Sequence, residues 1–142
     1  MRLKDQLTSL PAELASSLER EYSNVLEHVR LGEWDDAQVD GGRYAEILLR
    51  VIQWKRGGKY SPIGGKGRPN RKDIVGKARS DTSLDDSYRL QIPQAAEMLL
   101  DFRNNRNSAH VGDLDPNQID ANLVLSLVKW TLAEIVRLES TS

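Results

Sequence analysis

The sequence of 142 residues predicts a single all-α domain built from four main helices. Apolar residues recur at the spacing of an amphipathic helix in four long segments, and no segment shows the alternation of a strand. The hydrophobic content of 39% is enough to close one core, and the length leaves no room for a second domain, so residues 1–142 are expected to form one unit. There is no cysteine, which excludes a disulfide scaffold and thiolate metal sites.

The first two helices follow from their apolar spacing. Pro11 and Gly32 bracket the first helix, in positions typical of a helix start and stop. Its apolar residues are Leu14, Leu18, Tyr22, Val25, Leu26 and Val29. After a polar stretch, residues 33–40, the apolar run of residues 44–52 predicts a second helix that stops before Gly57.

Residues 57–70 join the second and third long helices and are expected to form a long mobile loop. Its glycines and prolines, at positions 57, 58, 62, 64, 65, 67 and 69, disfavour both helix and strand. Long loops without secondary structure in a compact domain are usually functional or disordered. A short helix is expected over about residues 71–79, with Gly76 lowering its propensity.

The third long helix is expected to begin near Ile92 and end at Gly112, and the fourth to run to about Leu138. Asp115 and Pro116 match an N-cap followed by proline at the first helical position. The fourth helix carries two apolar stripes, which are Ile119, Leu123, Leu127 and Trp130, and Val124, Val128, Ile135 and Leu138. A helix that is apolar on two sides needs partners on both. One small bundle covers one side, so we expect a homodimer.

Charge is distributed unevenly along the chain, although the formal net charge is only −1. Residues 55–79 hold nine Lys or Arg residues and one acid, so this segment is locally +8 and the rest of the chain is −9. Dense positive charge of this kind suits phosphate groups. The N-terminal residues are charged where a signal peptide is apolar, and no apolar stretch approaches the roughly 18 residues of a membrane span. A cytoplasmic protein without membrane contact is therefore expected.

The stretch from Arg103 to His110 is the candidate for a catalytic or binding site. The apolar stripe of the third helix, through Leu99, continues at the same spacing into Arg103, Arg106 and His110. Arg103 and His110 are about 20° out of line and roughly 10 Å apart along the axis, so they share a face. The simplest interpretation is a solvated helix end whose basic residues answer the negative end of the helix dipole. A polar site is favoured over it because Arg103, Arg106, Asn107 and His110 converge on the extension of a buried stripe.

Arg103 and Asn104, followed by five residues and His110 near the end of the penultimate long helix, resemble the R-N-x(3–5)-H signature of the HEPN superfamily. The helical architecture of nearly the whole chain fits this family, and the short motif is the specific part. HEPN domains are helical bundles that typically dimerise so that two Arg/His motifs line one cleft. Many are metal-independent endoribonucleases of toxin-antitoxin, abortive-infection and CRISPR-linked defence, and others serve as non-catalytic binding modules. The resemblance therefore implies an RNA-cleaving homodimer, with an antitoxin or a larger defence assembly as further partners.

The residues of this stretch suit RNA cleavage without a metal or a cofactor. Histidine titrates near neutrality, so His110 can act as general base for the 2′-OH or as general acid for the leaving 5′-oxygen, and a second copy across a dimer can take the complementary role. Arg103 stays protonated and presents a planar fork of donors to a phosphate on which charge builds. Supporting roles are expected for Asn104, Arg106 and Asn107. Glu46 either belongs to a solvated ion-pair face of the second helix or lines the cleft.

The basic segment is expected to supply sequence-independent RNA affinity rather than catalysis, because dense charge on a Gly- and Pro-rich loop binds phosphates without fixed geometry. The residues assigned to this role are Lys55, Arg56, Lys59, Lys66, Arg68, Arg71 and Lys72. The alternative is a loop whose charges pair with the acidic body of its own chain. For the whole protein, the competing hypotheses are a non-catalytic HEPN bundle that binds RNA, a nucleotide or a protein, and a DNA-binding helical module. RNA cleavage is preferred because the chemistry of the motif requires a 2′-OH.

The second histidine of the chain, His28, is expected to be a surface or packing residue of the first helix. Two histidines without a cysteine offer few ligands for zinc. No metal and no cofactor are therefore expected.

Overall fold

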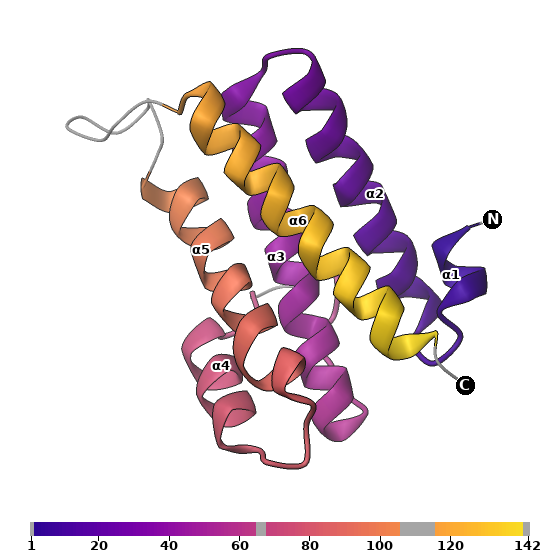
Figure 1. Ribbon diagram of the computed structural model, residues 1–142. Coiled ribbons are helices and arrows are strands. Elements are labelled where there is room, and N and C mark those ends of the chain that lie inside the picture. Colours follow the sequence, from indigo (N-terminus) through magenta and orange to yellow (C-terminus); the bar gives the residue numbers. More distant parts are fainter. Residues whose placement is uncertain (1, 65–67, 106–115, 141–142) are drawn as a thin grey trace.

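The computed structural model describes residues 2–64, 68–105 and 116–140, and every regular element in these ranges is a helix (Figure 1). The elements are α1 (Leu3–Gln6), α2 (Ala12–Arg30), α3 (Trp34–Gly57), α4 (Arg71–Ser80), the π-helical turn η1 (Ser87–Gln91), α5 (Ile92–Asn105) and α6 (Gln118–Glu139). The all-α class predicted from the sequence is confirmed.

The central helix of the molecule is α3, which packs against α2, α4, α5 and α6. Figure 1 shows α2, α3, α5 and α6 running lengthwise beside one another, with α4 at one end. The core lies between these helices, and its largest fully buried side chains include Leu14, Leu18, Tyr44, Leu48, Ile52, Ile92, Leu99 and Ile135. The hydroxyl group of Tyr44 can be buried there because it forms a hydrogen bond of 2.9 Å with Thr131 Oγ1.

The start of α3 differs from the expectation, because the helix includes almost all of the polar stretch of residues 33–40 instead of following it. Acidic residues occupy its first turn, where they interact favourably with the helix dipole. Two buried glycines then allow close approach to other helices. A Cβ atom on Gly41 would lie 2.7 Å from Val124 Cγ1 of α6, and one on Gly42 would lie 2.8 Å from Arg103 Nε of α5. The low helix propensity of glycine conceals this part of α3 in the sequence.

The start of α6 also differs from the expectation. The helix begins at Gln118, and Asn117 is its N-cap, with Oδ1 accepting a hydrogen bond of 2.9 Å from the backbone N–H of Asp120. The prediction that Pro116 occupies the first helical position is therefore wrong. The predicted cap, Asp115, lies outside the described residues.

The span of α4 and the start of α5 agree with the sequence, whereas α3 includes Gly57, the residue before which it was expected to stop. The short helix predicted over residues 71–79 is present as α4, and Asn70 caps it by accepting a hydrogen bond of 3.1 Å from the backbone N–H of Asp73. Helix α5 begins at Ile92 as predicted, directly after η1. Its predicted end at Gly112 lies outside the described residues.

The first part of the loop between α3 and α4 is held in place, in contrast to the mobility expected for it. From α3, Arg50 donates hydrogen bonds of 2.9 Å to Ser61 O and 3.0 Å to Pro62 O. Gln53 of the same helix accepts one of 2.9 Å from the backbone N–H of Ser61. Gly58, with a φ of 70°, allows the chain to leave the helix in the left-handed conformation. The loop therefore folds back onto α3.

The two apolar stripes of α6 have different environments. Val124, Val128 and Ile135 are fully buried, whereas Ile119 is 79% exposed and Trp130 is 44% exposed. One stripe therefore completes the core, and the other is largely exposed, although its Leu127 is partly buried against the core. Among the described residues, no helix is both long and apolar enough to cross a bilayer.

Candidate functional site

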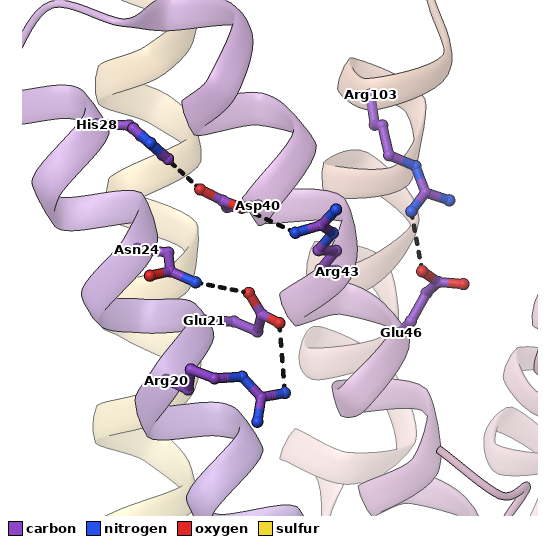
Figure 2. Close-up of polar contacts among 8 residues, drawn as sticks. All are labelled: Arg20, Glu21, Asn24, His28, Asp40, Arg43, Glu46 and Arg103. Carbon is purple, nitrogen blue, oxygen red and sulfur yellow. Dashed lines mark hydrogen bonds and ion pairs between the residues drawn. The ribbon is translucent and has the colours of Figure 1, made fainter. Parts of the chain in front are cut away.

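A row of charged side chains on α3 lies between polar side chains of α2 and α5, as Figure 2 shows. We call the eight residues drawn there the charged face; they are Arg20, Glu21, Asn24 and His28 of α2, Asp40, Arg43 and Glu46 of α3, and Arg103 of α5. The residues on α3 recur every third position, which places them on one side of that helix. Each carboxylate of the face contacts at least one basic side chain, so acidic and basic groups alternate across it.

Arg103 brings the predicted motif to the charged face. Its Nη1 donates a hydrogen bond of 2.9 Å to Glu46 Oε1, and the two side chains are only 15% and 17% exposed. The aliphatic part of Arg103 lies against Gly42, where an added Cβ would be 3.0 Å from Arg103 Cβ. On the other side, Glu46 Oε2 lies 3.7 Å from Nε of Arg68, a residue of the loop before α4. The carboxylate of Glu46 is thus placed between two guanidinium groups and holds Arg103 in one orientation.

His28 and Asp40 form a second pair on the charged face. His28 Nδ1 lies 2.5 Å from Asp40 Oδ2, and Asp40 Oδ1 lies 3.7 Å from Arg43 Nη1. Burial raises the pKa of the Asp40 carboxyl group above its usual value, and the hydrogen bond to His28 acts in the opposite direction. The pair of His28 and Asp40 is hard to predict from the sequence, because residues 33–40 look like a polar loop and give no sign that Asp40 lies on a helix.

A pocket of about 220 Å³ opens beside the charged face, between α2, α3 and the loop that follows α3. Its charged lining residues are Arg20, Arg43, Arg50, Arg68, Glu21 and Glu46. We call it the arginine pocket. Because Glu46 belongs both to its wall and to the pair with Arg103, the pocket and Arg103 are adjacent.

Several residues predicted for the site lie outside the described residues. These are Arg106, Asn107 and His110 of the motif and Lys66 of the basic segment. Asn104 lies on the last turn of α5 and is exposed. The relation of His110 to Arg103 therefore stays a prediction.

Four basic residues of the basic segment pair with acidic residues elsewhere in the chain. The pairs that reach outside it are Lys55 with Glu139 at 3.1 Å, Arg56 with Asp81 at 3.2 Å, Arg68 with Glu46 at 3.7 Å and Arg71 with Asp101 at 2.9 Å. Lys59 and Lys72 have no ion pair within the part of the chain that the structure describes. For Lys55, Arg56 and Arg71 these short distances favour the alternative in which the segment pairs with its own acidic body. The RNA-binding role of the segment stays a prediction.

One group of described side chains has a spacing that a metal ion would accept. The ligand atoms of His28, Glu33 and Asp36 lie within 4.8 Å of one another. Both carboxylates are exposed and lie at the start of α3, where acidic groups stabilise the helix dipole without an ion. We therefore assign this group to the helix start.

Comparisons of the chain with family models, with curated proteins and with solved structures found no match. The resemblance to the HEPN superfamily therefore depends on the Arg103 to His110 motif and on an all-α fold. Of the two residues to which the motif assigns catalysis, Arg103 lies within the described residues and His110 lies outside them.

Proposed function

We propose that the chain is a HEPN-type endoribonuclease that cleaves RNA without a metal ion, with a role in a toxin or defence system. The observation that carries this proposal is the placement of Arg103. Its guanidinium group is largely buried, is held by Glu46 at 2.9 Å, and lies near the end of the helix that leads into the His110 segment. A fixed arginine beside a histidine is what phosphodiester cleavage without a metal needs.

Arg103 supplies electrostatic stabilisation in this mechanism. A guanidinium group has five N–H donors, and Glu46 takes one of them, on Nη1. Within the part of the chain that the structure describes, the other donors form no hydrogen bond, so they can bind two oxygens of a phosphate in a planar fork. Because Glu46 already fixes the side chain, little reorganisation is needed when negative charge develops on the five-coordinate phosphorus.

His110 supplies proton transfer. In the proposed reaction a neutral imidazole takes the proton of the 2′-OH, the 2′-oxygen bonds to phosphorus, and the bond to the 5′-oxygen breaks. A protonated imidazole gives its proton to that leaving oxygen. The products are a 2′,3′-cyclic phosphate and a 5′-OH, and a dimer provides the two histidines for the two roles.

The second candidate function is a non-catalytic HEPN bundle that binds RNA, a nucleotide or a protein partner. The observation that favours it is also the Glu46 carboxylate, which contacts both Arg103 and Arg68 and offsets part of their charge. An arginine whose charge is offset in this way attracts a transition-state anion less strongly. The two functions differ in whether RNA is cut, so an activity assay separates them.

The test is incubation of total RNA with the protein in excess EDTA. Wild-type protein is expected to cleave RNA, and His110→Ala to be inactive with unchanged helicity by circular dichroism. Arg103→Lys keeps a cation beside Glu46 but lacks the fork, so it is expected to retain the fold and lose most activity. Arg137→Lys, an exposed arginine paired with Glu134, is the matched control. Activity that needs added metal, or that persists in His110→Ala, would exclude the proposed mechanism.

A further inference from the structure

In the arginine pocket the glutamate side chains are more deeply buried than three of the arginine side chains. The side chains of Glu21 and Glu46 are 9% and 17% exposed, whereas those of Arg20, Arg43 and Arg68 are 58%, 60% and 76% exposed. The carboxylates therefore form a partly buried floor that holds the guanidinium groups near one another, and the guanidinium groups face the solvent. An anion that approaches the pocket meets the arginines first.

The three exposed arginines form only long ion pairs with the described residues of their own chain. Arg20 lies 3.5 Å from Glu21, Arg43 lies 3.7 Å from Asp40 and Arg68 lies 3.7 Å from Glu46. These distances are longer than the roughly 2.7–2.9 Å of a charge-assisted hydrogen bond. Most donors of these three groups are therefore available to a ligand.

The fourth arginine of the pocket has a structural role. Arg50 is buried and donates to the carbonyl oxygens of Glu46, Ser61 and Pro62. It fixes the loop that forms one wall, and it adds a positive charge that forms no ion pair with a carboxylate among the described residues. With four arginines and two glutamates the lining has a net charge of +2, on a chain whose formal net charge is −1.

A larger pocket near α4 has a less suitable charge distribution. It has a volume of about 610 Å³ and is lined by basic residues together with Asp73 and Asp81. Lys77 lies 3.1 Å from Asp73, and Arg56 lies 3.2 Å from Asp81. Two of its three basic groups, Arg56 and Lys77, are thus closely paired within the pocket, and an added anion gains less from them than from the loosely paired arginines of the arginine pocket.

We propose that the arginine pocket binds one phosphate group of the RNA, next to the phosphate that Arg103 contacts. This inference rests on the proposed function, and it names the pocket as the subsite that positions the strand. Three guanidinium groups that approach from α2, α3 and the loop suit a tetrahedral anion, which offers oxygens in several directions. Glu46 joins the two sites, because one of its oxygens contacts Arg103 and the other faces Arg68. A single strand that crosses Glu46 places successive phosphates in the two sites.

The test uses a 2′-O-methyl oligoribonucleotide, which carries the phosphates but lacks the attacking hydroxyl group, so that binding is measured without cleavage. Fluorescence anisotropy gives the Kd for wild-type protein and for the triple variant Arg20→Gln, Arg43→Gln and Arg68→Gln. The matched control is the triple variant Arg2→Gln, Arg30→Gln and Arg137→Gln. It removes the same charge from arginines that are 68%, 65% and 65% exposed and that also pair with glutamates.

We expect the pocket variant to bind at least about tenfold more weakly, with a slope of log affinity against log salt that is less steep by about 0.7, the value for one phosphate of a single strand. The control variant should stay within about twofold of wild type, because its arginines only add to the long-range field. Equal weakening in both variants would show that only total charge matters and would overturn the inference. Unchanged binding in the pocket variant, with wild-type helicity, would overturn it as well.

Two further comparisons complete the test. One distinguishes a terminal from an internal phosphate, and the other distinguishes failure of the phosphate site from failure of the ribonuclease function. A 5′-phosphorylated and a 5′-hydroxyl oligonucleotide of the same sequence show whether the pocket takes a terminal or an internal phosphate: equal loss of affinity in the pocket variant indicates an internal one. If wild-type protein cuts no RNA but the pocket variant still binds more weakly, the proposed ribonuclease function fails and the phosphate site stands. If wild-type protein cuts RNA and the pocket variant binds normally, the phosphate site fails and the ribonuclease function stands.

Discussion

Two residues of α3 decide where the guanidinium group of Arg103 lies. Gly42 leaves space for the aliphatic part of the arginine, and Glu46, one turn further along, accepts its hydrogen bond. Neither Gly42 nor Glu46 belongs to the motif itself. If Arg103 binds a scissile phosphate, Gly42 and Glu46 are positioning residues. Substituting either one should change the rate of RNA cleavage by displacing Arg103.

The glycine can be tested directly. In Gly42→Ala the added Cβ would lie 2.8 Å from Arg103 Nε and 3.0 Å from its Cβ, so the arginine must move away from Glu46. Because a displacement of about 1 Å in a catalytic group can cost about a hundredfold in rate, RNA cleavage should fall by at least tenfold. The measurement is the rate of cleavage of a labelled RNA under single-turnover conditions.

Gly76→Ala is the control for this change, because nothing lies within 4 Å of a Cβ at that position on α4. It should leave cleavage unchanged and raise the free energy of unfolding by about 0.5–1 kcal/mol, since alanine is the better helix former. Wild-type cleavage in Gly42→Ala would mean that the placement of Arg103 against α3 is irrelevant to the reaction.

The pairing of Glu46 with Arg103 is expected to stabilise the fold. Glu46→Gln leaves a largely buried guanidinium group without its charged partner, so the free energy of unfolding should fall by about 1–3 kcal/mol. Urea denaturation at neutral pH measures this. The control is Glu27→Gln, which removes an exposed pair with Arg30 and should change stability little. Equal losses in the two variants would argue against a special role for the pair of Glu46 and Arg103.

The sequence predicts one half of this site better than the other. Arg103 was accessible to prediction because it continues an apolar stripe, which is a property of one helix and its period. Its partners were not, because the pairing of Glu46 with Arg103 depends on how α3 packs against α5, and the pairing of His28 with Asp40 depends on how α2 packs against α3. Gly42 carries no local signal, since a glycine needed for close approach looks in the sequence like a poor helix former.

At the scale of the helices, the predictable boundaries were those with strong local signals. The start of α5 at Ile92 and the span of α4 agree with the sequence. The start of α3 was hidden because its first turns are polar and contain two glycines, and tertiary contacts with α5 and α6 stabilise them. The sequence predicts the start of α6 too early because Asp115 and Asn117, two positions apart, are both good caps, and the structure uses Asn117.

The C-terminal end of α6 is joined to three other parts of the fold by one carboxylate. Glu139 accepts hydrogen bonds of 2.7 Å from Ser9 Oγ and 2.8 Å from Tyr88 Oη, and Lys55 Nζ lies 3.1 Å away. Burial raises the pKa of Glu139, but these three groups outweigh burial and leave the pKa below its usual value of 4.5. The ionised form is therefore the one that the folded state stabilises.

This shift predicts how stability depends on pH. Because the pKa of Glu139 is lower in the folded state than in the unfolded state, its contribution is fully present above about pH 5 and is lost as the pH falls below the usual value of 4.5. Glu139→Gln should lower the free energy of unfolding by about 1–3 kcal/mol at pH 7. The difference from wild type should shrink between pH 5 and about pH 3 in urea denaturation. A difference that stays constant over that range would show that the charge of Glu139 is not the stabilising feature.

At the scale of the whole molecule, one apolar stripe of α6 faces solvent. Ile119, Leu123 and Trp130 are 79%, 37% and 44% exposed, and they recur at positions that share one side of the helix. Large apolar side chains grouped on one side of a helix are typical of an interface. The expected occupant is a second copy of the chain, since the proposed reaction needs two histidines and one motif supplies one.

Light scattering decides the oligomeric state. We expect the molar mass of a dimer at micromolar concentration, and that of a monomer for the double variant Ile119→Asp and Trp130→Asp, because burying two carboxylates in an interface costs far more than the apolar contacts provide. Leu31→Asp, at a residue that is 56% exposed in the turn between α2 and α3, should remain dimeric. A wild-type monomer would remove both the dimer and the mechanism with two histidines.

If this chain cuts RNA by attack of the 2′-OH, the chemical structure of the product ends shows it most directly. Wild-type protein should be incubated in EDTA with an RNA of defined sequence, and the fragments analysed by mass spectrometry. We expect fragments that end in a 2′,3′-cyclic phosphate and begin with a 5′-OH, and no cleavage at a position where the attacking 2′-oxygen is methylated. Fragments with a 3′-OH and a 5′-phosphate, or cleavage at the methylated position, would contradict it.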